Sequence, residues 1–156
     1  MYRLIWIKVF LLVAVFALGT TGCPKSGLNT EYVEGTVMMD GKPLDNANIS
    51  FSPVTEGQGT PAVGVTDANG KYVLTAMQGG RDGRGTTPGQ YNVSVFKEIA
   101  TKHYTDEEMA ELVRREIPPD WGYKVVVPEK YTNPKKSGLT FEVKKGKNKF
   151  DFEVKE

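Results

Sequence analysis

The sequence predicts an all-β protein, an antiparallel β-sandwich of about seven strands with one short inserted helix and an N-terminal signal segment. Short runs of alternating apolar and polar residues recur from Glu31 onwards, which is the pattern of strands with one buried face. Turn sequences rich in Gly, Asn and Asp separate these runs. The 156 residues suffice for one domain with a real core.

Residues 1–22 have the three parts of a secretory signal peptide. The basic residues Arg3 and Lys8 come first, with no acid among them, and the ten-residue apolar run "VFLLVAVFAL" follows. The small residues "GTTG" then lead to Cys23. A membrane-spanning helix needs about 20 apolar residues, and Lys8 interrupts this stretch. We therefore predict a cleaved signal segment.

The end of this segment resembles the lipobox of bacterial lipoproteins. Gly22 and Thr21 suit the two positions before Cys23, whereas Thr20 stands where that pattern has leucine. The resemblance implies that residues 1–22 are a lipoprotein signal peptide and that Cys23 is acylated after cleavage. An ordinary signal peptide or an uncleaved anchor with an incidental cysteine is the alternative.

The predicted lipid anchor places the protein in the cell envelope, with the membrane as one partner. Residues 23–30 are then a polar tether between the lipid and the domain. Pro24 differs from the aspartate that retains some bacterial lipoproteins in the inner membrane. We therefore expect the outer membrane, with the domain facing the periplasm or the cell surface.

The strands follow in order along the mature chain. The apolar positions expected to share buried faces are Val33, Gly35 and Val37; Ile49 and Phe51; Val63 and Val65; Tyr72 and Leu74; Tyr91, Val93 and Val95; Leu139, Phe141 and Val143; and Phe150, Phe152 and Val154. The Asp-Gly pair at residues 40–41 predicts a hairpin, and "DANG" at 67–70 a compact turn. "KKGKNK" predicts a tight hairpin between the last two strands.

A helix is predicted over about residues 105–117, within an insert at 98–123. Thr105 and Glu108 have the spacing of a capping box. The apolar residues Met109, Leu112 and Val113 recur at helical spacing. We expect this face to pack on the edge of the sandwich.

The chain resembles a carboxypeptidase regulatory-like domain, which is a transthyretin-like β-sandwich. The matching motifs are Gly35, the turn at Gly41 to Leu44, Ile49 and Phe51, the turn at Thr66 to Tyr72, and Pro88 to Tyr91. They cover about residues 31–97 of a domain that we assign to residues 31–156. The resemblance implies a non-catalytic accessory module.

Composition excludes several function classes. The net charge of +1 gives no basic excess for nucleic acid. One cysteine and one histidine, His103, exclude an intrachain disulfide and a two-histidine metal centre. We therefore predict no catalytic set, no metal and no cofactor. We interpret Asp67, Asn69 and Gly70 as a turn in preference to a partial calcium loop, because the position of the bidentate glutamate holds Gln78.

Two functions remain open. The first is a lipid-anchored, non-catalytic module that contacts an envelope protein or a glycan. Its candidate binding residues are the aromatic residues beside the inserted helix, Tyr104, Trp121 and Tyr123, which could instead be packing residues. The alternative is an enzyme of unknown type on a transthyretin-like sandwich. Known enzymes of related fold use several histidines, which this chain lacks.

Overall fold

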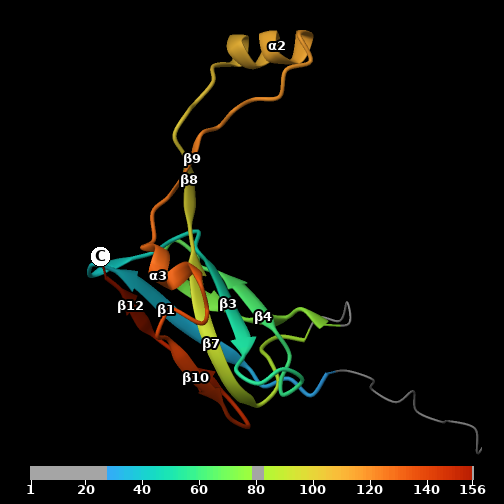
Figure 1. Cartoon of the computed structure of the whole chain (residues 1–156), viewed down its shortest axis with the longest axis vertical. Helices are drawn as coiled ribbons and strands as arrows, with labels where there is room; N and C mark the ends of the chain where they lie inside the picture. Colours follow the sequence, from blue (N-terminus) through green and yellow to red (C-terminus); the bar gives the residue numbers. More distant parts are fainter. Residues whose placement is uncertain (1–27, 79–82, 156) are drawn as a thin grey trace, which may run out of the picture.

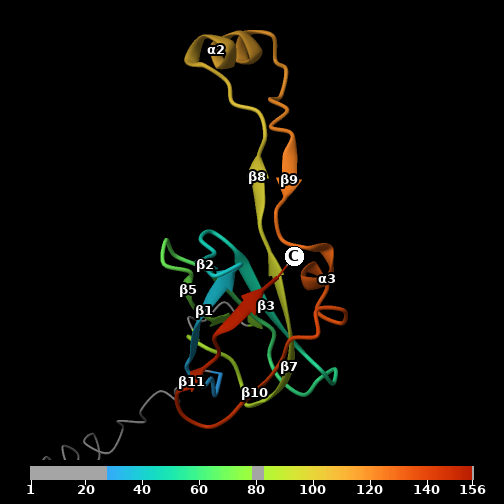
Figure 2. The same cartoon turned by 90° about the vertical axis from the view of Figure 1, so that its left-hand side faces the viewer.

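A computed structural model describes residues 28–78 and 83–155 of the protein. It confirms the predicted all-β class: two sheets pack face to face, and a narrow ribbon tipped by a helix rises from one end (Figures 1 and 2). The predicted signal peptide, Cys23 and most of the predicted tether lie outside the described residues.

The first sheet is built around β1 (Val33–Met39). On one side β1 pairs antiparallel with β2 (Lys42–Pro43) and β5 (Lys71–Val73). On the other side it pairs parallel with β11 (Asn148–Lys149) and β12 (Phe152–Val154). The sheet is therefore mixed, whereas a purely antiparallel sandwich was expected.

The second sheet is antiparallel throughout, in the order β10-β7-β3-β4-β6. Its strands are β3 (Asn48–Pro53), β4 (Ala62–Val65), β6 (Thr75–Ala76), β7 (Gly89–Phe96) and β10 (Thr140–Val143). The predicted hairpin between the last two strands is wrong, because β10 belongs to this sheet and β11 and β12 to the other. The turn at 144–147 carries the chain from one layer to the next.

The core lies between the sheets and consists mainly of the predicted faces. Val33, Val37, Ile49, Phe51, Leu74, Tyr91, Val93, Val95 and Val154 are fully buried. Leu139, Phe141, Phe150 and Phe152 are half-buried and pack against this cluster. A Cβ at Gly35 would lie 1.9 Å from the carbonyl oxygen of Phe150, so the close approach of these two strands requires glycine.

The predicted face of β4 is wrong. Val63 and Val65 are 40% and 56% exposed, while Ala62 and Gly64 face the core. A Cβ at Gly64 would lie 2.8 Å from the carbonyl oxygen of Val73, so this part of the core has room only for small residues. The two valines consequently lie on the outer surface of the sheet.

The insert forms a separate structure that we call the arm, residues 98–125. Its ribbon consists of β8 (Glu98–Ala100) and β9 (Tyr123–Val125), and its tip carries α2 (Asp106–Arg114). The predicted helix exists but is shorter than expected and lies far from the sandwich, with no buried residue (Figures 1 and 2). The prediction that its apolar face packs on the sandwich edge is therefore wrong.

After the arm, the chain returns along the edge of β7. The short helix α3 (Glu129–Thr132) buries Tyr131 against the core, and the Ser137 hydroxyl donates a hydrogen bond of 2.5 Å to the Val93 carbonyl. This segment covers the half of β7 that β10 leaves unpaired. Among residues 28–78 and 83–155, no helix is long and apolar enough to cross a membrane.

Candidate functional site

The arm is fixed to the sandwich at its base. The Lys97 ammonium contacts the Asp45 carboxylate at 2.8 Å, and the amide of Val126 donates to the Lys97 carbonyl at 3.0 Å. The hydrogen bond from Lys97 holds the pKa of the Asp45 carboxyl below its usual range. These contacts continue the direction of β7 into β8, so the arm leaves the sandwich along the axis of that strand (Figure 2).

The ribbon exposes apolar side chains on both of its faces. In its register Glu98 pairs with Val125, Ile99 with Lys124 and Ala100 with Tyr123. Because side chains alternate along a strand, Val125 and Tyr123 share one face and Ile99 lies on the other. Ile99 and Val125 are each 44% exposed, and Tyr123 is 62% exposed. No layer of the sandwich covers either face (Figure 1).

The neck between ribbon and helix is held by the aromatic residues at 104 and 121. Tyr104 packs edge-to-face against Trp121 with ring centroids 5.3 Å apart, and its hydroxyl donates to the Asp120 carbonyl at 2.8 Å. Lys102 forms an ion pair with Asp120, which lowers the pKa of Asp120 and raises that of Lys102. The structure thus brings Tyr104 and Trp121 together as packing partners, both half-buried.

Tyr123 differs from these two residues. It lies on β9, and among the described residues it forms no ring pair. Of the three predicted binding aromatics, it is the one whose side chain faces solvent. The hydrogen bonds from the amides of Thr101 and Lys102 to the carbonyls of Gly122 and Trp121 fix the backbone beside it.

The helix at the tip has only local contacts, within the arm. The predicted capping box is present: the amide of Glu108 donates to the Thr105 hydroxyl, and the amide of Thr105 donates to the Glu108 carboxylate. Acidic residues fill the first turn, where the helix dipole favours them. Val113 is 72% exposed and Ile117 beyond the helix is 46% exposed. The helix therefore presents apolar side chains to solvent at the far end of the molecule.

Replacing Trp121 with alanine tests whether it holds the arm to the core. We expect the free energy of unfolding of the sandwich to change by less than about 1 kcal/mol, because the partner of Trp121 is Tyr104 within the arm. Thermal unfolding followed by circular dichroism measures this. A fall in melting temperature like that of a core substitution would mean that Trp121 connects the arm to the sandwich.

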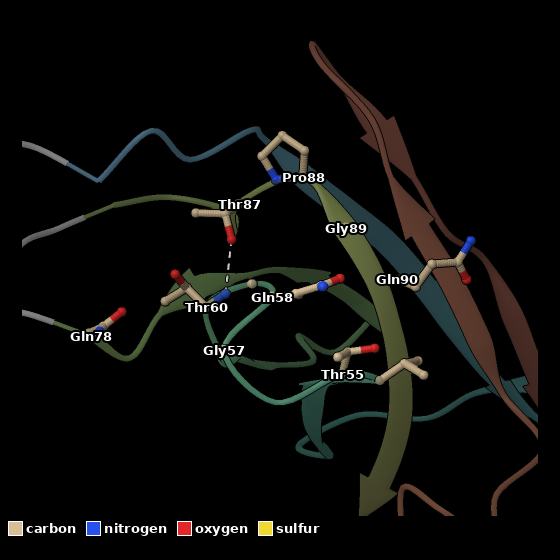
Figure 3. Close-up of a pocket in the computed structure, with 11 residues that line it drawn as sticks. Thr55, Gly57, Gln58, Thr60, Gln78, Thr87, Pro88, Gly89 and Gln90 are labelled. Carbon is tan, nitrogen blue, oxygen red and sulfur yellow. Dashed lines mark hydrogen bonds between the residues drawn. The ribbon is translucent and has the colours of Figure 1, made fainter.

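A polar cleft lies at the opposite end of the sandwich from the arm, beside the start of β7 (Figure 3). Its volume is about 790 Å³. Its lining includes the amides of Gln58, Gln78 and Gln90 and the hydroxyl of Thr55. Among residues 28–78 and 83–155, those that line it include no Asp, Glu, His, Cys, Lys or Arg. These described residues can exchange hydrogen bonds with neutral groups but offer no general acid or base.

The hydroxyls beside the cleft bind one another. The buried Tyr91 hydroxyl accepts from the Thr60 amide at 3.2 Å, donates to the Thr87 carbonyl at 2.8 Å and lies 3.0 Å from the Thr86 hydroxyl. The Thr60 amide also donates to the Thr87 hydroxyl at 2.9 Å (Figure 3). Because the protein itself satisfies these groups, the network closes the end of the sandwich without a ligand.

The candidate calcium loop at Asp67 and the single histidine, His103, have no partners for metal binding among the described residues. The Asp67 carboxylate accepts from the amides of Asn69 and Lys71 at 2.8 and 2.9 Å, so the predicted turn is confirmed. His103 is exposed in the loop before α2. Within the described part of the chain, no three His, Cys, Asp or Glu residues lie close enough together to hold a metal ion.

The sequence did not single out Ile99, Val113, Ile117 and Val125 as exposed residues. Their signal is that apolar residues are spread through a charged stretch of chain; of the four, only Val113 belongs to the face that we expected to pack on the sandwich. Comparison with known proteins adds no assignment: no family model, curated protein or solved structure matches this chain.

Proposed function

We propose that the protein is a non-catalytic module of the bacterial cell envelope, anchored through acylated Cys23, that binds another envelope protein through its arm. The arm carries this proposal. It projects from the sandwich, buries no residue of its helix and exposes Val113, Ile117 and Tyr123 to solvent. An ordered structure that gives no core contact to its own domain is suited to contact with another molecule.

The chemistry of the arm favours a protein partner. Exposed aliphatic and tyrosine side chains, separated by charged residues, are the composition of interface centres and rims. Arm residues 98–125 include seven acidic and four basic residues, a net charge of −3. A partner surface with apolar pockets and a basic rim would complement both features.

The polar cleft gives no support to the enzyme alternative. A catalytic site needs titratable groups placed in a cavity, and the described residues that line this cleft include none. Asp120 and Lys102, whose pKa values are shifted, form an exposed ion pair in the neck of the arm. That pair has the geometry of a structural contact.

Excision of the arm tests the proposed function. Glu98 and Val125 are directly paired across the ribbon, so an Asn-Gly turn can join them in place of residues 99–124. We expect the melting temperature to stay near that of the full chain, since no core residue is removed. Chemical cross-linking in intact envelopes should give adducts with the full chain that the excised chain no longer forms.

A matched pair of substitutions separates the arm from the sandwich surface. Val113→Ser changes an exposed valine of the arm, and Val63→Ser changes an exposed valine of the sandwich. The first should weaken the adducts and the second should leave them unchanged. If the excised chain keeps every adduct of the full chain, the arm is not the binding site.

A further inference from the structure

The turn between β10 and β11 concentrates positive charge. We call residues 144–149 the basic turn, because four of its six residues are lysines. Lys144 lies 3.4 Å from Glu142, and Lys149 forms an ion pair of 2.7 Å with Asp151. Lys145 and Lys147 are exposed and have no carboxylate partner among the described residues. Two ammonium groups that form no ion pair among the described residues therefore lie at the tip of the turn.

The basic turn is an ordered structure. The side chain of Asn148 is largely buried; its oxygen accepts from the Lys144 amide at 2.8 Å, and its nitrogen donates to the carbonyls of Lys144 and Gly146 at 2.8 and 3.1 Å. The Gly146 amide donates to the Glu31 carboxylate at 2.7 Å. The lysines are thus held beside the residue at which the domain begins.

The covalent chain fixes how far this end of the domain can lie from the predicted anchor. Leu28 is the fifth residue after Cys23, and an extended chain spans at most about 3.6 Å per residue, or about 18 Å in total. The arm lies at the other end: β7 begins at Gly89, near the Glu31–Thr86 bridge, and ends at Phe96, where the arm leaves (Figure 2).

We propose that the basic turn docks on an anionic phospholipid surface and sets the sandwich upright, with the arm directed away from the membrane. This inference rests on the anchoring through Cys23 proposed above. Each lysine near an anionic surface favours the docked orientation over the others by about fivefold. The attraction acts within a screening length of about 8 Å at physiological ionic strength. The net negative arm is repelled by the same surface, which favours the same orientation.

The chain offers a native probe of this orientation. It has two tryptophans, Trp6 and Trp121, and Trp6 lies in the predicted signal peptide, so the mature protein keeps Trp121 in the arm as its single fluorophore. The mature protein, purified from membranes, is reconstituted into vesicles that carry a dansyl-labelled lipid. One set is neutral phosphatidylcholine, and the other also contains phosphatidylglycerol. Energy transfer from Trp121 to the membrane should be weaker on the anionic vesicles.

Charge variants identify the basic turn as the cause. Lys145→Gln/Lys147→Gln removes the two charges that form no ion pair. We expect the preference for the upright orientation to fall about 25-fold. Energy transfer from Trp121 on anionic vesicles should then rise toward its value on neutral vesicles. Lys135→Gln/Lys136→Gln makes the same change in net charge on the loop after α3 and should behave as the parent. Salt at about 1 M shortens the screening length to about 3 Å and should reduce the difference between vesicles.

Vesicle flotation separates this inference from the anchoring on which it rests. If the chain floats with the vesicles but the two lysine variants behave alike, the docking of the basic turn is wrong and the anchoring stands. If the chain floats but energy transfer from Trp121 is equal on neutral and anionic vesicles, the docking of the basic turn is also wrong and the anchoring stands. If the chain does not float, the anchoring is wrong and the orientation proposal fails with it.

Discussion

Replacing Phe51 with alanine is expected to lower the free energy of unfolding by about 3–5 kcal/mol. Phe51 is fully buried at the centre of β3 and is the hub of the aromatic cluster. Its ring contacts Tyr91, Phe141 and Phe150 at centroid separations of 5.9, 6.1 and 6.2 Å. Truncation removes all three contacts and leaves a cavity between the sheets. Such a loss is a large share of the ~5–15 kcal/mol that stabilises a domain.

Phe96→Ala is the matched control, because Phe96 lies at the end of β7 and is 37% exposed. We expect a change of less than about 1 kcal/mol for this variant. Urea unfolding of both proteins gives the two free energies directly. Similar losses for Phe51→Ala and Phe96→Ala would mean that the described core is not the one that stabilises the protein.

Replacing Cys23 with serine is expected to abolish fatty-acid labelling and to release the protein from the membrane fraction or leave it as a precursor. Stable attachment needs more than one acyl chain or a second signal, and a processed lipoprotein carries its chains on this residue. Labelling of cells with radioactive palmitate, followed by fractionation, measures both effects. Ser26→Ala in the same segment should label as the wild type. Equal labelling of the Cys23→Ser protein would exclude acylation at this residue.

Alternation alone predicted the buried faces of most strands, because large apolar residues at every second position can all be buried only if that one face packs on the core. The strand at 62–65 is the exception. Its sequence "AVGV" offers Val63 and Val65 on one face and Ala62 and Gly64 on the other, and hydropathy favours the valines. The backbone of Val73 lies too close to Gly64 for a larger side chain to face the core there. The two valines therefore face outward, and this closeness is visible only in the packed structure.

The connection at residues 144–147 shows a second limit. A short turn between two amphipathic strands has the same local sequence whether the strands pair or change layers. Here Asn148 binds the backbone of both Lys144 and Tyr32, which directs the chain toward β1. The sequence shows Asn148 but not that it binds Tyr32, the residue just before β1, so the change of layer could not be predicted.

For the candidate site, the sequence located the insert, its capping box and its aromatic residues. It did not predict that the helix stands away from the sandwich, because periodicity gives the direction of an apolar face but not what covers it. The pairing of Tyr104 with Trp121 and the exposure of Tyr123 likewise depend on the ribbon register between residues 100 and 123.

The parallel pairing of β1 with β11 and β12 determines when this domain can fold. The partners of Val33 and Val37 on that side are Asn148 and Phe152, each 115 residues further along the chain. While those residues remain inside the ribosome, β1 lacks its neighbours on one side and the cluster around Phe51 lacks Phe150. We therefore expect the domain to complete its folding only after Val154 has emerged.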